Sequence, residues 1–513
     1  MTGRSGGRTI RGMTTVTLDG TEPAGAVAAT RPDEGREPLP RGVWLIAGAV
    51  FVLLLATADR YGWHRDELYF REAGRHLAWG YVDQPPFTPL VARLVDIVAP
   101  GNLVALRFVP ALATVATIVL GALIVGELGG DRRAQLVGAG TVASAGFVLG
   151  AGHLLSTVTF DLTAWLAVLW LVARMLRTAN PRWWVAIGAV AGAALLNKDL
   201  VTVLVGAILV ALVVERRRDL LLTWWLPVGG ALALAIAAPY LVWEATHGWP
   251  QFEMAHALSQ RLGAEDRTQL LPQQILLLGP PLAILWFAGV RFLRQAAGGR
   301  YRPLLWAWPL TVAAVFVTGG RPYYAMGMSL LVALAGAQTA SRTGKGIVAL
   351  LALNAAASVF IALPVLPISA AGFANALNDS AGETIGWPEL THEVASVVHD
   401  LPPAERAHVV ILTGSYGEAG AIDRFGPALG LPPAYSGHNS YYDFRRPTDD
   451  AATVVAVRFE PKELAPEFAH CSQVGKVDDH RNIDNEAQGV PILVCRGLRA
   501  PWTQTWPRLR HVS

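Results

Sequence analysis

Two adjacent carboxylates mark the part of the sequence with the greatest capacity for chemistry. Asp66 and Glu67 lie in the polar segment 59–87, which reads DRYGWHRDELYFREAGRHLAWGYVDQPPF and also holds Asp83 before two prolines. A carboxylate within hydrogen-bond reach of a hydroxyl can take its proton as the oxygen attacks a substrate. Neighbours on a helix point about 100° apart, so the two cannot serve one atom from a helix interior. An acidic helix start stabilised by the helix dipole is an equal alternative.

Other candidate residues lie at the predicted outer ends of apolar stretches. They are Asp161, Lys198, Asp199, His256, Arg261, Arg321 and Tyr324. Each has a plainer interpretation: Asp161 as an N-cap, Lys198 and Asp199 as a simple pair, and Arg321 as a snorkelling side chain. A transport pathway would place charges in mid-span, where this sequence has almost none. The pattern therefore favours chemistry at the outer interface, on a substrate that is partly lipid.

The amino-acid composition indicates which class of protein positions these residues. The chain has 513 residues, of which 52% are hydrophobic and 16% charged, with a mean hydropathy of +0.37. Soluble domains carry about 25% charged residues. The sequence is therefore that of a polytopic α-helical membrane protein, and wholesale disorder, a collagen-like fibre and a disulfide-rich secreted module are excluded. A net charge of +3 gives no footprint for nucleic acid.

About eleven stretches approach the length of a membrane span. Their limits are 42–59, 103–126, 134–152, 161–176, 183–197, 200–214, 220–243, 272–292, 303–318, 325–340 and 346–366. Arginines and lysine gather in alternate loops, and the positive-inside rule places those loops and the N-terminus in the cytoplasm. The loops 60–102 and 244–271 then face outward from the plasma membrane, the latter as a solvated loop. The segment 59–87 is expected to form an amphipathic helix at the outer interface, along Tyr69, Ala73 and Leu77.

Three regions follow from this pattern. Residues 1–41 form a disordered cytoplasmic tail, 42–366 a transmembrane domain, and 367–513 a small extracytoplasmic α/β domain. In the last region, strands are predicted at His408–Leu412, Thr453–Phe459 and Val490–Cys495, after a helix with the apolar stripe Leu390, Val394, Val397 and Val398. Outside the cytoplasm a Cys471–Cys495 disulfide is somewhat favoured over two unpaired cysteines.

The motifs DELYF at 66–70 and GYVDQPP at 80–86 resemble the first outer loop of the C-type membrane glycosyltransferases. The resemblance is to the family of protein O-mannosyltransferases and the lipid A aminoarabinose transferase. It extends to Asp161 and to RPYY at 321–324, while GSYGEAGA at 414–421 and SGHN at 436–439 resemble the tail of actinobacterial members. It implies transfer of a sugar from a polyprenyl-phosphate donor to a hydroxyl of a cell-envelope glycan, lipid or protein, usually with inversion.

The resemblance also implies roles for single residues. Asp66 corresponds to the general base, Glu67 would orient the helix or the acceptor, and Asp161 would be a second acidic group in the cavity. Arg261, Arg321 and Tyr324 would bind the donor phosphate, and Asp83 with His256 would hold a divalent metal. One carboxylate and one histidine make a weak metal site, and a turn-capping role for Asp83 is an equal alternative.

Two features qualify the resemblance. Relatives with aminoarabinose activity have lysine where this chain has Gln84, which argues against that sugar. The glycine-rich run Gly414–Gly420 fits no nucleotide-binding spacing and is interpreted as a structural turn or an acceptor-recognition surface. The rival functions are a transporter or flippase for a lipid-linked or small solute, and a non-catalytic scaffold.

Overall fold

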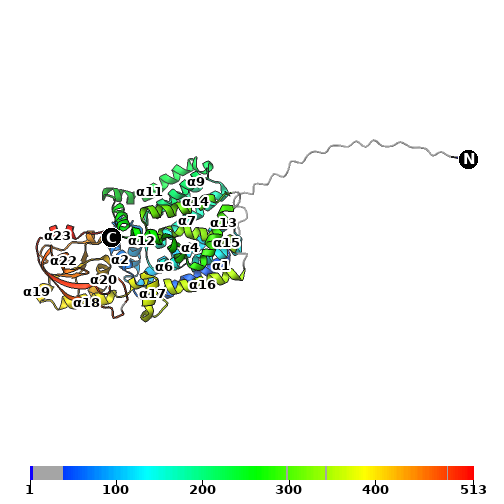
Figure 1. Ribbon diagram of the computed structural model, residues 1–513. Coiled ribbons are helices and arrows are strands. Elements are labelled where there is room, and N and C mark those ends of the chain that lie inside the picture. Colours follow the sequence, from blue (N-terminus) through cyan, green and yellow to red (C-terminus); the bar gives the residue numbers. More distant parts are fainter. Residues whose placement is uncertain (4–37, 296–298, 341–343, 482, 513) are drawn as a thin grey trace. The chain divides into compact units, whose positions relative to one another are not determined.

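The structure is a computed structural model that describes residues 1–3, 38–295, 299–340, 344–481 and 483–512 (Figure 1). Contacts within the chain divide it into Met1–Pro38 and Leu39–Ser513. Most of the predicted tail 1–41 lies outside the described residues, and helix α1 begins at Arg41. The second unit contains both the apolar helices and the C-terminal sheet.

The N-terminal two-thirds of this unit is helical. Its helices are α1 Arg41–Ala56, α2 Arg65–Arg75, α3 Phe87–Val98, α4 Leu103–Glu127, α5 Arg132–Ser144, α6 Gly146–His153, α7 Thr157–Thr178, α8 Trp183–Leu195, α9 Val201–Val214, α10 Arg218–Leu221, α11 Trp225–Thr246, α12 Pro250–Leu278, α13 Ala283–Gln295, α14 Arg302–Thr318, α15 Met326–Ala340 and α16 Lys345–Ala362, with short 3₁₀ turns η1 Pro280–Leu282 and η3 Pro322–Ala325. Polar side chains accept from backbone N–H groups at several helix starts, as Asn102, Asp131 and Ser156 do for α4, α5 and α7.

The predicted count of about eleven spans is not confirmed. Among the described residues, four helices are long and apolar enough to cross a membrane, namely α4, α7, α11 and α16, and two bent pairs raise the number to six. The pair α5 and α6 bends by 59°, and α12 with the segment 280–295 bends by 94°. Four shorter apolar helices are α1, α8, α9 and α14. The prediction counted such short and broken stretches as full spans, although 20 residues are needed to cross about 30 Å of hydrocarbon.

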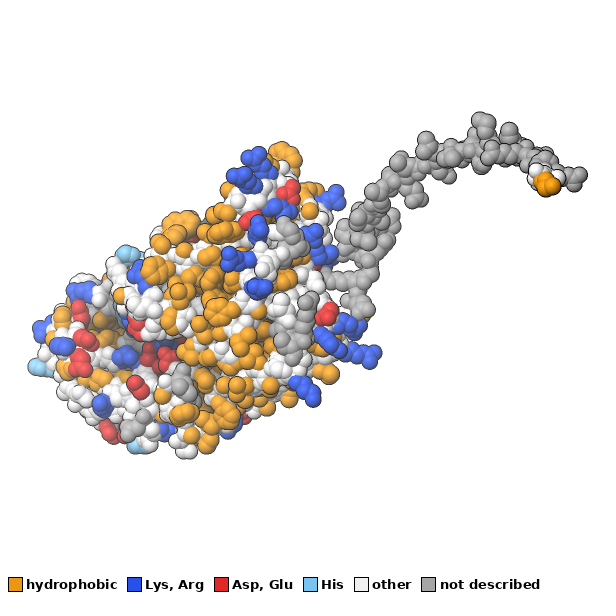
Figure 2. All heavy atoms as spheres, turned by 45° about the vertical axis from the view of Figure 1, so that its right-hand side comes forward, with side chains coloured by type: hydrophobic (Ala, Val, Ile, Leu, Met, Phe, Trp, Pro, Cys, Tyr) orange, Lys and Arg blue, Asp and Glu red, His pale blue; other side chains and the backbone are white. Residues whose placement is uncertain are grey.

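The distribution of side chains over the surface agrees with a membrane protein. Hydrophobic side chains gather in a broad belt over the helices, and lysines and arginines line the rim that lies away from the C-terminal domain (Figure 2). Large apolar side chains on this surface include Leu234, Val242 and Phe287, which are exposed as lipid-facing residues would be.

Two predictions about the outer loops need correction. The helix predicted in the first loop exists as α2, but it ends at Arg75, so Leu77 lies beyond it. The segment 244–271, expected as a solvated loop, is mostly the helix α12. Pro250 opens that helix and Gly279, at a positive φ of 106°, follows its last residue.

The C-terminal domain is a five-stranded mixed sheet with helices around it. Its strands are β1 Val410–Thr413, β2 Ala434–Ser436, β3 Val454–Val457, β4 Phe468–Lys476 and β5 Pro491–Leu498. The order is β2-β1-β3-β5-β4, with β1 parallel to β2 and β3, and β5 antiparallel to β3 and β4. The helices and turns are η5 Ile368–Ala370, α17 Ala371–Leu377, η6 Asp379–Thr384, α18 Trp387–His399, α19 Pro403–Arg406, α20 Tyr416–Phe425, η7 Gly426–Leu429, α21 Tyr441–Phe444, α22 Pro461–Leu464 and α23 Trp502–Leu509.

The three predicted strands correspond to β1, β3 and β5, and the predicted helix is α18, with Leu390, Val394 and Val398 buried. The sequence analysis missed β2, which is three residues long, and β4, whose side chains are mostly exposed. Cys471 and Cys495 form a disulfide between directly paired positions of β4 and β5, so the favoured alternative is the observed one.

The C-terminal domain shares a hydrophobic core with the first outer loop. Leu68 and Tyr69 of α2 lie in one buried cluster with Trp387 of α18 and Ile422 of α20. Helix α20 approaches α2 so closely that a Cβ atom on Gly420 would lie 2.8 Å from Cβ of Leu68. The predicted amphipathic helix therefore buries its apolar face against protein.

Candidate functional site

The start of helix α2 fixes the Asp66–Glu67 pair. His64 is the N-cap, and its Nδ1 accepts a hydrogen bond from the Asp66 backbone N–H. The carboxylate of Glu67 reaches back to accept from the backbone N–H of His64, so the two residues form a capping box. Because Asp66 and Glu67 are consecutive helical residues, their side chains leave the helix in different directions.

Glu67 is enclosed by protein on all sides. Its side chain is 0% exposed, and Arg107 of α4 donates to both carboxylate oxygens, from Nε at 2.9 Å and from a terminal nitrogen at 2.7 Å. The backbone N–H of Leu155 donates to Oε1 as well. Arg107 also donates to the carbonyls of Ala58 and Gly62. This network ties α2, α4 and the α6–α7 connection together and leaves no carboxylate oxygen free for a substrate.

Asp66 has the opposite environment. Its side chain is 33% exposed, and its Oδ1 accepts a hydrogen bond of 2.9 Å from the phenol of Tyr416 on α20. Arg65 lies 3.6 Å from the same oxygen. Burial alone would raise the pKa of Asp66, but His64, Arg65, the Tyr416 hydrogen bond and the Lys198 ammonium together lower it. Asp66 is thus an accessible carboxylate that stays ionised.

Lys198 is the cation of the site. It lies between α8 and α9, with its ammonium 5.3 Å from the ring centre of Tyr323 and 4.9 Å from that of Tyr324. Its charge acts on both Asp66 and Asp161. The expected pairing of Lys198 with Asp199 is wrong, because Asp199 instead accepts a 2.7 Å hydrogen bond from Tyr240.

Asp161 lies on α7, one turn inside the helix that Ser156 caps, so the N-cap interpretation of Asp161 is wrong. Its Oδ1 is buried and has no hydrogen-bond partner among the described residues. A buried carboxylate oxygen without a protein partner is costly unless something else binds to it. The structure therefore brings three of the candidate residues, Asp66, Asp161 and Tyr324, around Lys198.

Asp83 is held by hydrogen bonds to two other side chains. Its Oδ1 accepts from the phenol of Tyr69 at 2.7 Å and its Oδ2 from the amide of Asn439 at 3.4 Å. Burial raises the pKa of Asp83 to about 6, against the lowering effect of the Tyr69 hydrogen bond.

His256 lies exposed on α12, with Nε2 hydrogen-bonded to Gln260. The described residues contain no group of three or more His, Cys, Asp or Glu side chains that could hold a metal. A metal site built on Asp83 and His256 thus lacks a third protein ligand, and we derive no step through a metal.

The two predicted phosphate-binding arginines differ in their surroundings. Arg321 precedes η3 and is 3.5 Å from Asp266 of α12, which partly neutralises it. Arg261 is exposed on α12. Arg267 of the same helix donates to the carbonyls of Phe316 and Val317, at the end of α14.

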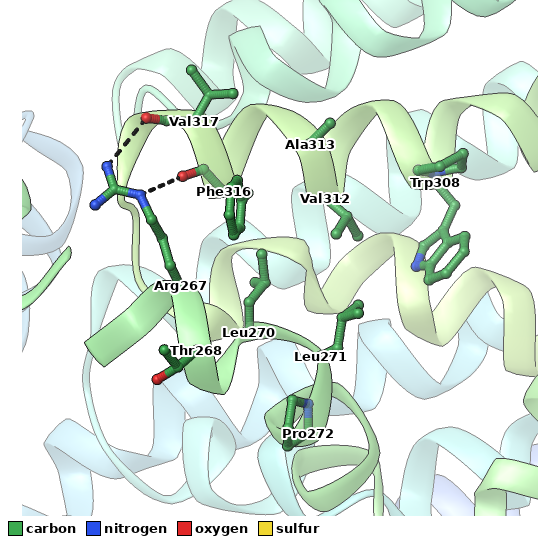
Figure 3. Close-up of a pocket in the computed structure, with 11 residues that line it drawn as sticks. Arg267, Thr268, Leu270, Leu271, Pro272, Trp308, Val312, Ala313, Phe316 and Val317 are labelled. Atoms are coloured by element: carbon green, nitrogen blue, oxygen red, sulfur yellow. Dashed lines mark hydrogen bonds between the residues drawn. The ribbon is translucent and has the colours of Figure 1, made fainter. Parts of the chain in front are cut away.

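An apolar groove of about 590 Å³ extends from Arg267 between α12 and α14 (Figure 3). Leu270, Leu271 and Pro272 line one wall. The other wall is made by Trp308, Val312, Ala313, Phe316 and Val317. Its chemistry suits a hydrocarbon chain rather than a polar solute.

Comparison with known proteins identifies this arrangement. Residues 83–243 match the family model of dolichyl-phosphate-mannose-protein mannosyltransferases. The fold is that of ArnT from Cupriavidus metallidurans. In the apo state ArnT superposes with a TM-score of 0.55, and bound to undecaprenyl phosphate with a TM-score of 0.57; in each case the identity is 17% over 88% of this chain and 97% of ArnT. The family-model match over residues 83–243 and the fold shared with ArnT both agree with the resemblance to C-type membrane glycosyltransferases that the sequence motifs carry.

The oligosaccharyltransferase of Archaeoglobus fulgidus, solved with Zn and sulfate, is a more distant match. Its TM-score is 0.46, with 14% identity over 81% of this chain and 67% of that protein. A comparison with curated proteins found no match. The predicted resemblance is borne out by the family-model match over residues 83–243 and by the shared fold, and the apolar helices agree with a location in a membrane.

For three residues of this candidate site, the sequence did not reveal the contacts that the structure shows. Lys198 was noted but interpreted as half of a local pair, and only the fold brings it to Asp66 and Asp161. Tyr416 lies 350 residues from Asp66 in the sequence. It belongs to the run Gly414–Gly420, which was interpreted from its glycines alone. Arg107 carried a usable signal, since a charge five residues into an apolar helix requires a buried partner.

Proposed function

We propose that this glycosyltransferase moves a sugar from a polyprenyl-phosphate donor to an acceptor hydroxyl at the outer membrane face. The hydroxyl oxygen attacks the anomeric carbon while the bond from that carbon to the phosphate oxygen breaks. The proton of the hydroxyl goes to Asp66, and polyprenyl phosphate leaves with both electrons of the broken bond. The attack from the opposite side inverts the anomeric centre.

The observation that carries the proposal is the environment of Asp66. A general base must be ionised, accessible and within reach of the acceptor hydroxyl. Asp66 is partly exposed, and the groups around it lower its pKa. Glu67 is not accessible in this arrangement, since it is fully enclosed by Arg107 and backbone N–H groups. Of the two roles considered for Glu67, we therefore assign it the orientation of the helix.

The phosphate leaving group requires positive charge rather than a strong acid. Lys198 is the cation whose charge reaches both Asp66 and Asp161, and we assign it the donor phosphate together with Arg321 and the phenol of Tyr324. Arg261 is assigned a contact with the phosphate as the donor enters, because it is exposed on α12. The free Oδ1 of Asp161 is placed to accept hydrogen bonds from sugar hydroxyls.

The lipid part of the donor has a suitable surface on α12 and α14. The groove there is lined by hydrocarbon side chains over most of its length. The related ArnT has been solved with undecaprenyl phosphate bound, which supports a polyprenyl-phosphate donor for this chain.

The acceptor is a hydroxyl of a cell-envelope glycan, lipid or protein. The N-terminus is assigned to the cytoplasm and the C-terminal domain to the outer face, in line with the rim of basic residues opposite that domain (Figure 2).

The proposal is tested with membranes that contain the protein and a panel of radiolabelled polyprenyl-phosphate sugars. We expect one donor to be consumed by the wild type and not by Asp66→Asn, while both proteins are present in equal amounts. Translocation of a lipid-linked sugar that survives Asp66→Asn would instead favour a flippase. Capture of a partner protein without consumption of any donor would favour a scaffold.

A further inference from the structure

The phenol of Tyr416 reaches from the C-terminal domain into the transmembrane site. Tyr416 is the first residue of α20, directly after the N-cap Ser415, whose hydroxyl accepts from the backbone N–H of Gly417. From this position its hydroxyl donates to Oδ1 of Asp66 at 2.9 Å. The other oxygen of that carboxylate has no such donor among the described residues: Nδ1 of His64, 3.8 Å away, itself accepts the hydrogen bond from the Asp66 backbone N–H.

The ring of Tyr416 is fixed on both faces. Tyr69 stacks on one face at 4.7 Å between ring centres, and His438 stacks on the other at 4.9 Å. The backbone N–H of Tyr416 donates to Nδ1 of His438, and His511 stacks in turn on His438 at 4.9 Å. Four rings thus form a column from α2 to the last described turn of the chain, which leaves the phenol little freedom to turn.

The helix that carries Tyr416 is seated tightly on α2. A Cβ on Gly417 would lie 3.0 Å from the Trp387 ring and 3.3 Å from Cβ of Arg65, and one on Gly420 would lie 2.8 Å from Cβ of Leu68. Gly417 and Gly420 therefore serve the close approach of α20 to α2, whereas the run had been interpreted as a turn or an acceptor surface. Gly414, the first glycine of the run, instead lies against Arg458, where a Cβ on the glycine would be 3.1 Å from Cβ of the arginine.

We propose that Tyr416 is a positioning residue through which the C-terminal domain holds the base: its phenol occupies Oδ1 of Asp66 and leaves Oδ2 to receive the acceptor hydroxyl. The inference rests on the function proposed above. The C-terminal domain is then part of the catalytic apparatus, since the base is correctly aimed only while α20 is seated on α2.

The electrostatic surroundings of Asp66 give this role a distinct signature. The charged and titratable groups that face Asp66 are His64 and Arg65 on its own helix, Lys198 before α9, Tyr323 in η3, Asp83 before α3, Glu383 in η6 and Tyr416 in α20. The Tyr416 hydrogen bond is one of the interactions that lower the pKa of Asp66. Its removal raises that pKa, so the carboxylate becomes protonated, and inactive as a base, at a higher pH.

The test uses the full-length protein in lipid nanodiscs with the donor found in the panel. Tyr416→Phe keeps the stacked ring and removes only the hydroxyl, and Tyr442→Phe, whose ring stacks on Trp506 in the same domain, is the matched control. A hydrogen bond to a charged group contributes about 1.5–3 kcal/mol, which corresponds to about a 10- to 100-fold change. We expect kcat/KM of Tyr416→Phe to fall by about this factor, with its acid limb moved to higher pH, while Tyr442→Phe keeps the rate and pH profile of the wild type.

Two results would overturn the inference while leaving the glycosyltransferase function intact. One is an unchanged rate and pH profile in Tyr416→Phe, and the other is a slower rate with an unmoved acid limb, which would make the contact merely structural. Absence of sugar transfer by the wild type with every donor is a different result. It would overturn the proposed function, and the inference with it.

Discussion

Removing one partner of the buried Glu67–Arg107 pair tests how the site is positioned. Arg107 is 1% exposed and Glu67 is 0% exposed. In Arg107→Met the Glu67 carboxylate keeps only the two backbone donors of His64 and Leu155. In Glu67→Gln the guanidinium keeps its carbonyl acceptors but loses its counter-charge. Breaking a buried pair from one side costs about 3–5 kcal/mol of unfolding free energy, because the remaining charge is uncompensated.

The assay is thermal unfolding in nanodiscs, with sugar transfer measured on the same samples. Each single variant should lose stability and turnover together, and the double variant Glu67→Gln/Arg107→Met should lose much less than the sum of the two. Asp219→Asn is the control, since Asp219 pairs with Arg217 at the surface and is 52% exposed; its effect should stay below about 1 kcal/mol. If Glu67→Gln abolished transfer at unchanged stability, Glu67 would act on the substrate and the positioning argument would fail.

Three further predictions follow. Gly420→Val should lower turnover about tenfold or more, because its Cβ would lie 2.8 Å from Cβ of Leu68 and overpacking of this kind costs about 1–3 kcal/mol. Gly372→Ala, which meets nothing within 4 Å, should leave the rate unchanged. Lys198→Met should raise the KM for the donor about tenfold or more. It should also move the acid limb of kcat/KM to higher pH, since the ammonium lowers the pKa of Asp66. Lys198→Arg should restore most of the donor affinity and of the pH profile, and equal KM values in all three proteins would remove Lys198 from the phosphate site. Reduction of the Cys471–Cys495 disulfide should destabilise the C-terminal domain by about 2–4 kcal/mol, seen as a lower melting temperature with dithiothreitol, and an identical melting curve would contradict it.

The sequence predicts the membrane class, the enzyme family and the catalytic loop, because these depend on local composition and on short motifs. Helix α2 and its acidic start follow from the pattern around Asp66 and Glu67. The strands β1, β3 and β5 follow from continuous apolar runs, as expected for a buried sheet. The Cys471–Cys495 bridge follows from there being two cysteines in a segment predicted to lie outside the cytoplasm.

The remaining features depend on contacts between distant segments. The residues next to a charged side chain in the sequence do not reveal its partner in the fold. A pair with Asp199 was therefore considered for Lys198, whereas its ammonium lies over the rings of Tyr323 and Tyr324. The function of Tyr416 depends on the docking of α20 against α2, which no periodicity reveals. The predicted span count is not confirmed for a simpler reason: apolar stretches of about 15 residues satisfy composition but not the length of a membrane crossing.

The most direct test of the account is the rate of polyprenyl phosphate release by the purified protein in nanodiscs, measured for the wild type, Asp66→Asn and Asp59→Asn. Asp59 is an exposed carboxylate just before the same loop and serves as the matched control. A positioned general base contributes about 10²–10⁴-fold, so we predict a loss of this size in Asp66→Asn and none in Asp59→Asn. Release by Asp66→Asn at a rate within about twofold of the wild type would contradict the assignment of Asp66 as the base.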